Sequence, residues 1–224
     1  MRSNRTTRAP GARTALPAML FCAALVPAPA QAHPHVWVQA RTEIVLDEAK
    51  SLVALRLAWT FDPAYSAFAV LNLDSRRDGV PDPEKLAELA RSRARALGES
   101  GSFVQAKLNG RSLRLAAPSE ARAAYRDGRL TLSFTLAPEA RGEAVRTLVL
   151  ATLDPDFYVA FGLPPEADAV RLTGGPACLL KLTRPAREAR EGEQIIPDAE
   201  ATARPAAAAA TGADYAGRVL VACP

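Results

Sequence analysis

Three features of the sequence predict an α+β fold, in which a mostly antiparallel sheet of short strands and hairpins has two helices packed on it. Apolar and polar residues alternate in many short runs, which is the period of a half-buried strand. Several of these runs are joined by Asn-Gly or Asp-Gly pairs, which favour tight antiparallel hairpins. Two other segments, at residues 64–73 and about 83–97, carry the signals of helices.

The clearest hairpin joins residues 36–46 to residues 52–61. Both runs partly alternate between apolar and polar positions, and residues 47–51 between them are polar. A short polar connection between two such runs is typical of antiparallel neighbours. We therefore predict that these two strands pair directly.

The first helix is predicted to follow the second of these strands. Asp62 is suited to cap a short helix over residues 64–73, and Pro63 to occupy its first position. The second helix is predicted from about Pro83 to Leu97, with Gly98 as its stop. Its apolar face is expected to carry Leu86, Leu89, Ala90 and Leu97, and its water-facing side Arg91, Arg93 and Arg95.

The remaining strands are recognised largely from their turns. Asn109-Gly110 and Asp127-Gly128 each separate two strand-like runs, and both pairs favour a two-residue hairpin turn. Short strands are predicted at residues 103–108, 113–115, 121–126, 129–136, 145–153, 157–161, 170–172, 178–182 and 218–223.

The first 32 residues have the features of a cleavable signal peptide. A basic segment precedes the apolar run Ala15 to Val26, and Ala30-Gln31-Ala32 forms a small-residue cleavage site. The apolar run is shorter than the roughly twenty residues that a membrane-spanning helix needs. Cys22 lies inside this run and lacks the setting of a lipid-attachment cysteine. We therefore expect cleavage after Ala32 and a soluble periplasmic protein.

Four domain segments are expected. After the signal peptide (1–32), residues 33–183 form the α+β domain, 184–214 an Ala/Pro-rich mobile excursion, and 215–224 a strand that returns to the domain. The chain has 28 basic and 24 acidic residues, and the signal peptide holds four of the arginines and no acid. Because the remainder is near neutral and has no basic cluster, we expect no nucleic-acid partner.

Two cysteines, Cys178 and Cys223, remain after cleavage. An oxidising compartment favours a disulfide between them, and two separate buried thiols are the alternative. Such a bond would hold the C-terminus against the domain.

The chain's two histidines, His33 and His35, are expected at positions one and three of the mature protein. Cleavage would free an amine beside the His33 imidazole, and the two together can chelate a divalent metal. His35 can add a third nitrogen, because residues two apart in an extended chain point the same way. Pro34 has no amide N–H, which excludes a site that uses the deprotonated amide of residue two. The alternative is that both histidines are only a polar lead-in to the first strand.

Nitrogen donors suit nickel, cobalt, copper and zinc, so the predicted ligand is a divalent transition metal at His33 and His35. No catalytic residues are predicted. A hydrolase triad would have to use the terminal histidines themselves, and a copper oxidase would need another histidine further along the chain.

Other candidate residues receive structural interpretations. Asp74, Asp78, Gly79 and Asp82 partly match a calcium loop, but Arg76 and Lys85 stand where oxygen ligands are needed, which favours an exposed turn. Asp62 and Asp154 each precede proline and are expected to act as a cap or turn former rather than as metal ligands. Five aromatic residues near these turns are assigned to the core rather than to a pocket: Tyr65, Phe68, Phe157, Tyr158 and Phe161.

Several stretches resemble a family of exported proteins catalogued as domain of unknown function one-thousand-and-seven. They are His33 to Val38, Trp59 to Asp62 with Tyr65 to Phe68, Tyr125 with Asp127 to Leu130, and Asp154-Pro155 with Tyr158 to Phe161. Members are often labelled the periplasmic component of an uncharacterised ABC-type transport system and are encoded near membrane exporters of nickel and cobalt. Many relatives have a more complete acidic loop where this chain has Arg76.

The resemblance and the histidine pair together imply an accessory or binding component of a transition-metal transport system. Its expected partner is an inner-membrane metal transporter, and it is not itself expected to span the membrane. The alternative is a metal-independent periplasmic interaction module that docks such a transporter through its sheet edge or its aromatic turns.

Overall fold

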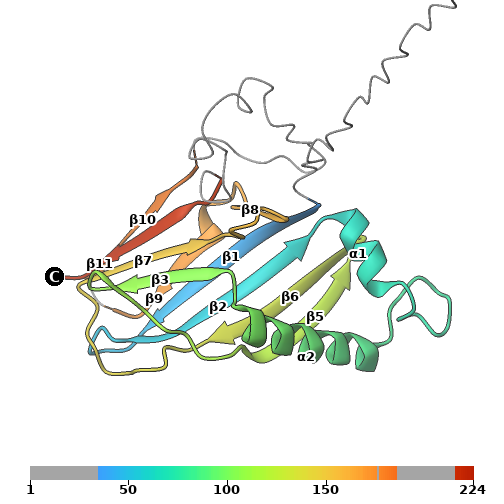
Figure 1. The fold of residues 1–224 in the computed structure, drawn as a ribbon, viewed down its shortest axis with the longest axis horizontal. Coiled ribbons are helices and arrows are strands. Elements are labelled where there is room, and N and C mark those ends of the chain that lie inside the picture. The colour runs from blue at the N-terminus through green and yellow to red at the C-terminus, as the bar shows by residue number, and fades with distance from the viewer. Residues whose placement is uncertain (1–34, 176, 186–214) are drawn as a thin grey trace, which may run out of the picture. The chain divides into compact units, whose positions relative to one another are not determined.

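The computed structural model describes residues 35–175, 177–185 and 215–224, and these residues form two β-sheets and two α-helices (Figure 1). The helices are α1 (Pro63–Val70) and α2 (Pro83–Ser100), and a 3-10 turn spans Ala167–Ala169. The strands are β1 (Val36–Leu46), β2 (Leu52–Phe61), β3 (Val104–Leu108), β4 (Arg111–Ser112), β5 (Ser119–Arg126), β6 (Arg129–Leu136), β7 (Thr147–Thr152), β8 (Val159–Gly162), β9 (Val170–Thr173), β10 (Leu179–Thr183) and β11 (Arg218–Ala222). The predicted α+β class is confirmed.

The first sheet has the strand order β5-β6-β2-β1-β8, and β9 also pairs with β1. Its centre is the predicted antiparallel hairpin, in which Ile44 of β1 lies opposite Leu55 of β2. On the other edge of β1, β8 pairs in parallel along residues 36–39 and β9 in parallel along residues 42–45. The sheet is therefore mostly antiparallel, as predicted, with parallel pairing at one edge.

The second sheet is wholly antiparallel, with the order β10-β11-β7-β3-β4. The returning strand β11 lies between β10 and β7, where we expected only that it would rejoin the domain. Both predicted two-residue turns are present, since Asn109, Gly110, Asp127 and Gly128 all have positive φ angles. Positive φ at both central residues is what a tight hairpin turn requires.

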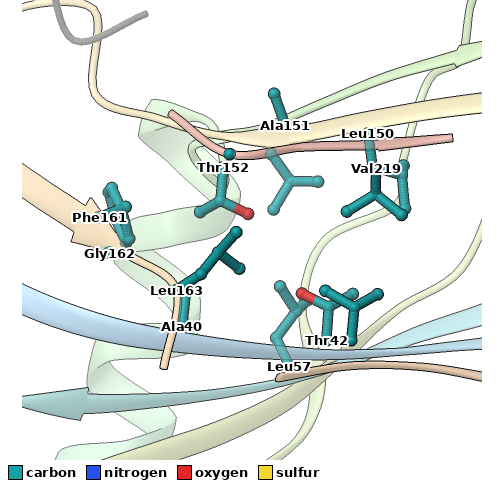
Figure 2. A pocket seen from close by; sticks show the side chains of 13 residues that line it. Ala40, Thr42, Leu57, Leu150, Ala151, Thr152, Phe161, Gly162, Leu163 and Val219 are labelled. Atoms are coloured by element: carbon teal, nitrogen blue, oxygen red, sulfur yellow. The ribbon is translucent and has the colours of Figure 1, made fainter. Parts of the chain in front are cut away.

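The main hydrophobic core takes side chains from both sheets and from α2. Alternate residues of β1, β2 and β6 supply its first wall, and β7 and β11 supply part of the second. Figure 2 shows side chains from β1 and β2, such as Thr42 and Leu57, facing Leu150 and Val219 of the second sheet across a small void. Its volume is about 20 Å³, enough for one water molecule at most.

The helices depart from prediction at their C-terminal ends. Asp62 caps α1 as predicted and accepts a hydrogen bond from the Tyr65 N–H (2.8 Å), but the helix ends at Val70 rather than residue 73. The prediction that Gly98 stops α2 is wrong, because the helix continues to Ser100. A Cβ at Gly98 would lie 3.2 Å from the Cβ of Ala117, so this glycine permits close packing instead.

Among the described residues, no helix has the length and apolar character needed to cross a bilayer.

Glu43 of β1 is expected to make the stability of the protein depend on pH in the acid range. Its carboxylate accepts a hydrogen bond from the Thr173 hydroxyl (2.7 Å) and pairs with Arg56 (3.3 Å). The Thr173 bond, and then Arg56, lower the pKa of Glu43 below its ordinary value of 4.5. Ionised Glu43 therefore stabilises the fold fully when the pH is above its unfolded-state pKa. This contribution to the free energy of unfolding is lost as the pH falls through the lower folded-state pKa.

Denaturant unfolding followed from about pH 6 to about pH 3 checks this expectation. Glu43→Gln should lose less stability on acidification than the wild type. Glu48→Gln, at an exposed position in the turn after β1, is the control and should follow the wild type. An unchanged acid dependence in Glu43→Gln would contradict the assignment.

Candidate functional site

His35 lies directly before β1 and is exposed. Its backbone N–H donates to the carbonyl oxygen of Tyr158 (2.9 Å), and its ring lies 4.8 Å from the Tyr158 ring, centroid to centroid. The backbone of His35 is thereby held at the β8 edge of the first sheet. The other predicted ligand, His33, lies outside the described residues.

Two buried carboxylates organise the backbone around the start of β1. Asp62, which is 4% exposed, accepts hydrogen bonds from the Tyr65 N–H and, 25 residues back in the chain, from the Trp37 N–H (3.0 Å). Asp154 accepts from the N–H groups of Asp156 (3.0 Å) and Val159 (2.9 Å), the first residue of β8. The predicted structural roles of both aspartates are confirmed, since each satisfies N–H groups that would otherwise lack partners.

The described residues do not by themselves supply a metal site. Among residues 35–175, 177–185 and 215–224, no group of three or more His, Cys, Asp or Glu side chains is placed to hold an ion. The nitrogen donor of His35 suits a transition metal, and the second predicted ligand, His33, lies outside the described residues.

The segment that resembles a calcium loop, residues 74–85, uses its carboxylates in hydrogen bonds and an ion pair within the segment. The Asp74 carboxylate accepts hydrogen bonds from the N–H groups of Gly79 (2.7 Å) and Asp78 (3.3 Å). Slight desolvation acts to raise the pKa of Asp74, but these bonds outweigh it and lower the pKa below its ordinary value. Asp82 is engaged with Lys85 (3.4 Å) and with the Ser75 N–H (3.2 Å). This geometry agrees with the predicted exposed turn.

A pocket of about 270 Å³ lies where α2 crosses the inner face of the first sheet. Its sheet side comes from alternate residues at the start of β1, the end of β2 and the start of β6, and its other walls from α1, α2 and the β8 region. The lining residues are Val36, Val38, Trp59, Phe61, Tyr65, Leu89, Arg93, Ala96, Leu97, Phe103, Ala123, Leu130, Leu132, Tyr158, Val159 and Phe161. Figure 1 shows α2 lying across β5 and β6 of the first sheet.

Three of the five aromatic residues assigned to the core also line this pocket: Tyr65, Tyr158 and Phe161. Tyr65 stacks on Phe61 with ring centroids 4.6 Å apart. Of the other two, Phe157 is buried as predicted and stacks on Tyr215, whereas Phe68 is 71% exposed on α1. The core assignment is confirmed for Phe157 and Phe161, both buried, and Tyr65 packs against the core; it is wrong for Tyr158 and Phe68, which are exposed.

Tyr158 connects the pocket to the start of the first strand. Its backbone carbonyl accepts the hydrogen bond from the His35 N–H, and its ring packs beside the His35 imidazole. Tyr158 also lines the pocket and is 50% exposed. His35 and the pocket are therefore neighbours.

Sequence reasoning missed Trp59, Phe103 and Arg93 as pocket residues. Alternation along β2 did indicate that Trp59 and Phe61 share one face of the sheet. It did not show that this face would be left partly open beneath α2. Arg93 is exposed, as predicted, but it also borders the pocket.

The fold and the site define a two-sheet α+β protein with an apolar pocket beside the start of its first strand. The chain belongs to the family described as "Protein of unknown function (DUF1007)", whose model matches residues 18–223. The resemblance noted in the sequence is thus confirmed over nearly the whole chain. No curated protein matches the chain.

Proposed function

We propose that the protein is a periplasmic accessory or binding component of a transition-metal transport system, and that it binds nickel, cobalt, copper or zinc through His33 and His35. The observation that supports this most directly is the position of His35. Its backbone is held by the Tyr158 carbonyl while its side chain is exposed at the start of β1. Because its backbone is already fixed, His35 has less conformational freedom to lose when its side chain binds a metal.

The donor chemistry follows from the proposed cleavage after Ala32. The freed amine and the His33 imidazole form one chelate, and the His35 imidazole adds a third nitrogen. Metal binding needs these nitrogens without their protons, so metal uptake releases protons and strengthens as the pH rises. The proposed partner is an inner-membrane metal transporter, as the family resemblance implies.

The test begins with N-terminal sequencing of the exported protein, which should start at His33. Calorimetric titration with nickel, copper and zinc should then detect uptake of at least one metal by this form. His35→Ala should weaken that uptake by about tenfold or more, because one of three nitrogen donors is lost. A second form in which the His33 amine is acetylated keeps both imidazoles but removes the amine donor, and it should also bind more weakly.

Equal metal affinity in His35→Ala and the wild type would remove His35 from the site. If the exported protein retains residues 1–32, His33 has no free amine, and the amine is excluded from the proposed site. The absence of heat with every metal would end the metal proposal.

A second candidate function is a metal-independent module that docks a membrane transporter. It is favoured by two large apolar side chains that are exposed at α1, Phe68 (71%) and Leu71 (65%). The two functions separate in one capture experiment with the membrane fraction. Capture that survives a chelator and the removal of both histidines, but is lost in Phe68→Ser, would favour the docking module.

A further inference from the structure

We propose that the pocket between α2 and the first sheet, which we call the α2 pocket, binds a small carboxylate with an apolar body and holds the carboxylate group at Arg93. The proposal goes beyond metal handling and does not depend on it. Three properties of the described residues carry it: the size of the pocket, its single positive charge and a buried N–H group without a partner.

The α2 pocket is large for an accidental packing defect. Its volume of about 270 Å³ contrasts with about 20 Å³ for the void between the two sheets. An apolar cavity of roughly 150 Å³ is enough to hold benzene. The α2 pocket therefore has room for a chain of about eight carbons or for a substituted aromatic ring.

The walls define the chemistry of the ligand. Fifteen of the lining residues are apolar or aromatic, and Arg93 is the one charged residue among them. Within the described residues Arg93 makes no hydrogen bond or ion pair, and no Asp or Glu lines the α2 pocket. An unpaired guanidinium beside an apolar cavity is complementary to an anion that carries an apolar body, and its fork of donors matches a carboxylate.

Trp59 adds a second polar group. Its side chain lines the α2 pocket, the residue is 2% exposed, and its Nε1 has no hydrogen-bond partner in the described part of the chain. A buried indole N–H normally finds an acceptor, so this one calls for an explanation. An oxygen of the carboxylate, or of a substituent on the apolar body, is the acceptor that it lacks.

The position of the α2 pocket makes it accessible. Tyr158 and Arg93 are both exposed and both border it, so a ligand can enter between α2 and the β8 edge. Trp59 also supplies a signal, because it is one of only two tryptophans in the chain and packs within 4.8 to 4.9 Å of Phe134 and Phe161, centroid to centroid.

The experiment titrates the full exported protein with octanoate in the presence of a chelator, and follows both calorimetric heat and tryptophan fluorescence. 1-Octanol, which has the same apolar body without the charge, is titrated in parallel. We expect saturable binding of octanoate, with Arg93→Gln weakening it by about tenfold while leaving 1-octanol unchanged. Arg91→Gln is the matched control: it lies on the same helix, is exposed and does not border the pocket, so its octanoate affinity should equal that of the wild type.

A second variant tests the cavity itself. Ala123→Phe places a ring into the α2 pocket from β5, an edge strand that tolerates aromatic residues, and should abolish binding of both probes. Its circular dichroism and unfolding curve should match those of the wild type, and Ala124→Phe, at the neighbouring position not among the lining residues, serves as its control.

Four results would overturn the proposal: no saturable octanoate binding, octanoate binding that Arg91→Gln weakens as much as Arg93→Gln, octanoate and 1-octanol bound with equal affinity, or full binding in folded Ala123→Phe. A chelator is present throughout, so the octanoate experiment does not involve metal. A negative result would overturn the α2 pocket proposal only, and metal uptake at His33 and His35 is tested by the separate metal titration.

Discussion

Replacing Cys178 and Cys223 together with alanine is expected to lower the free energy of unfolding by about 4 kcal/mol. The predicted disulfide is present and joins residues 45 positions apart, one just before β10 and the other just after β11. In the chain-entropy model, a cross-link that closes a loop of this length removes about that much conformational freedom from the unfolded chain. Within the described part of the chain, β10 is an edge strand of the second sheet that pairs only with β11, so the bond also holds the outer end of that pair together.

Denaturant unfolding of the oxidised wild type and the double variant measures this effect. The wild type treated with a reductant is the matched control and should resemble the variant, because both lack the cross-link but only one lacks the sulfur atoms. A double variant as stable as the oxidised wild type would show that the unfolded chain is already constrained in this region.

Gly174→Ala is expected to destabilise the fold by about 3 kcal/mol. Gly174 follows β9 and has a φ of +77°, a conformation that disfavours a side chain. A Cβ there would also overlap the carbonyl oxygen of Leu46 at the end of β1 and lie 3.0 Å from the Leu46 carbonyl carbon. Because the obstacle is backbone rather than a mobile side chain, β1 and β9 would have to separate.

Gly128→Ala is the control for the backbone conformation alone. Gly128 has a φ of +74° in the β5–β6 turn, and nothing lies within 4 Å of where its Cβ would be. It should therefore cost only about 1 kcal/mol, the strain of the left-handed conformation. Equal losses in the two variants, measured by denaturant unfolding, would show that the approach of Gly174 to Leu46 carries no additional energy.

The structural role of the Gly174-Gly175 pair depends on a neighbour that is distant in the sequence. In the sequence it is an isolated pair without the context of a phosphate-binding loop. In the structure it passes against the end of β1 on the way to Cys178, and a Cβ at Gly175 would lie 2.6 Å from the Leu46 side chain. No local pattern could identify this neighbour, since Leu46 is more than a hundred residues away along the chain.

The amino-acid sequence by itself determined the elements that depend on local chemistry. Alternation and polar turns identified the β1–β2 hairpin, Asn-Gly and Asp-Gly identified two tight turns, and Asp62-Pro63 identified the start of α1. Each of these rests on interactions between residues close in the chain, which is why a pattern of neighbours is enough to predict it. The pairing of Cys178 with Cys223 was also predictable, because only two cysteines follow residue 32.

Only the tertiary structure decided which distant segments meet. The parallel pairing of β8 and β9 with β1, the hydrogen bond from the Trp37 N–H to Asp62, and the placement of α2 over Trp59 all join residues far apart in sequence. The α2 pocket is the consequence: alternation shows which side chains face inward, but whether they are covered completely depends on the helix that crosses them. Arg93 illustrates this, because helical spacing places it toward water, and only the packing of α2 on the sheet sets it beside an apolar cavity.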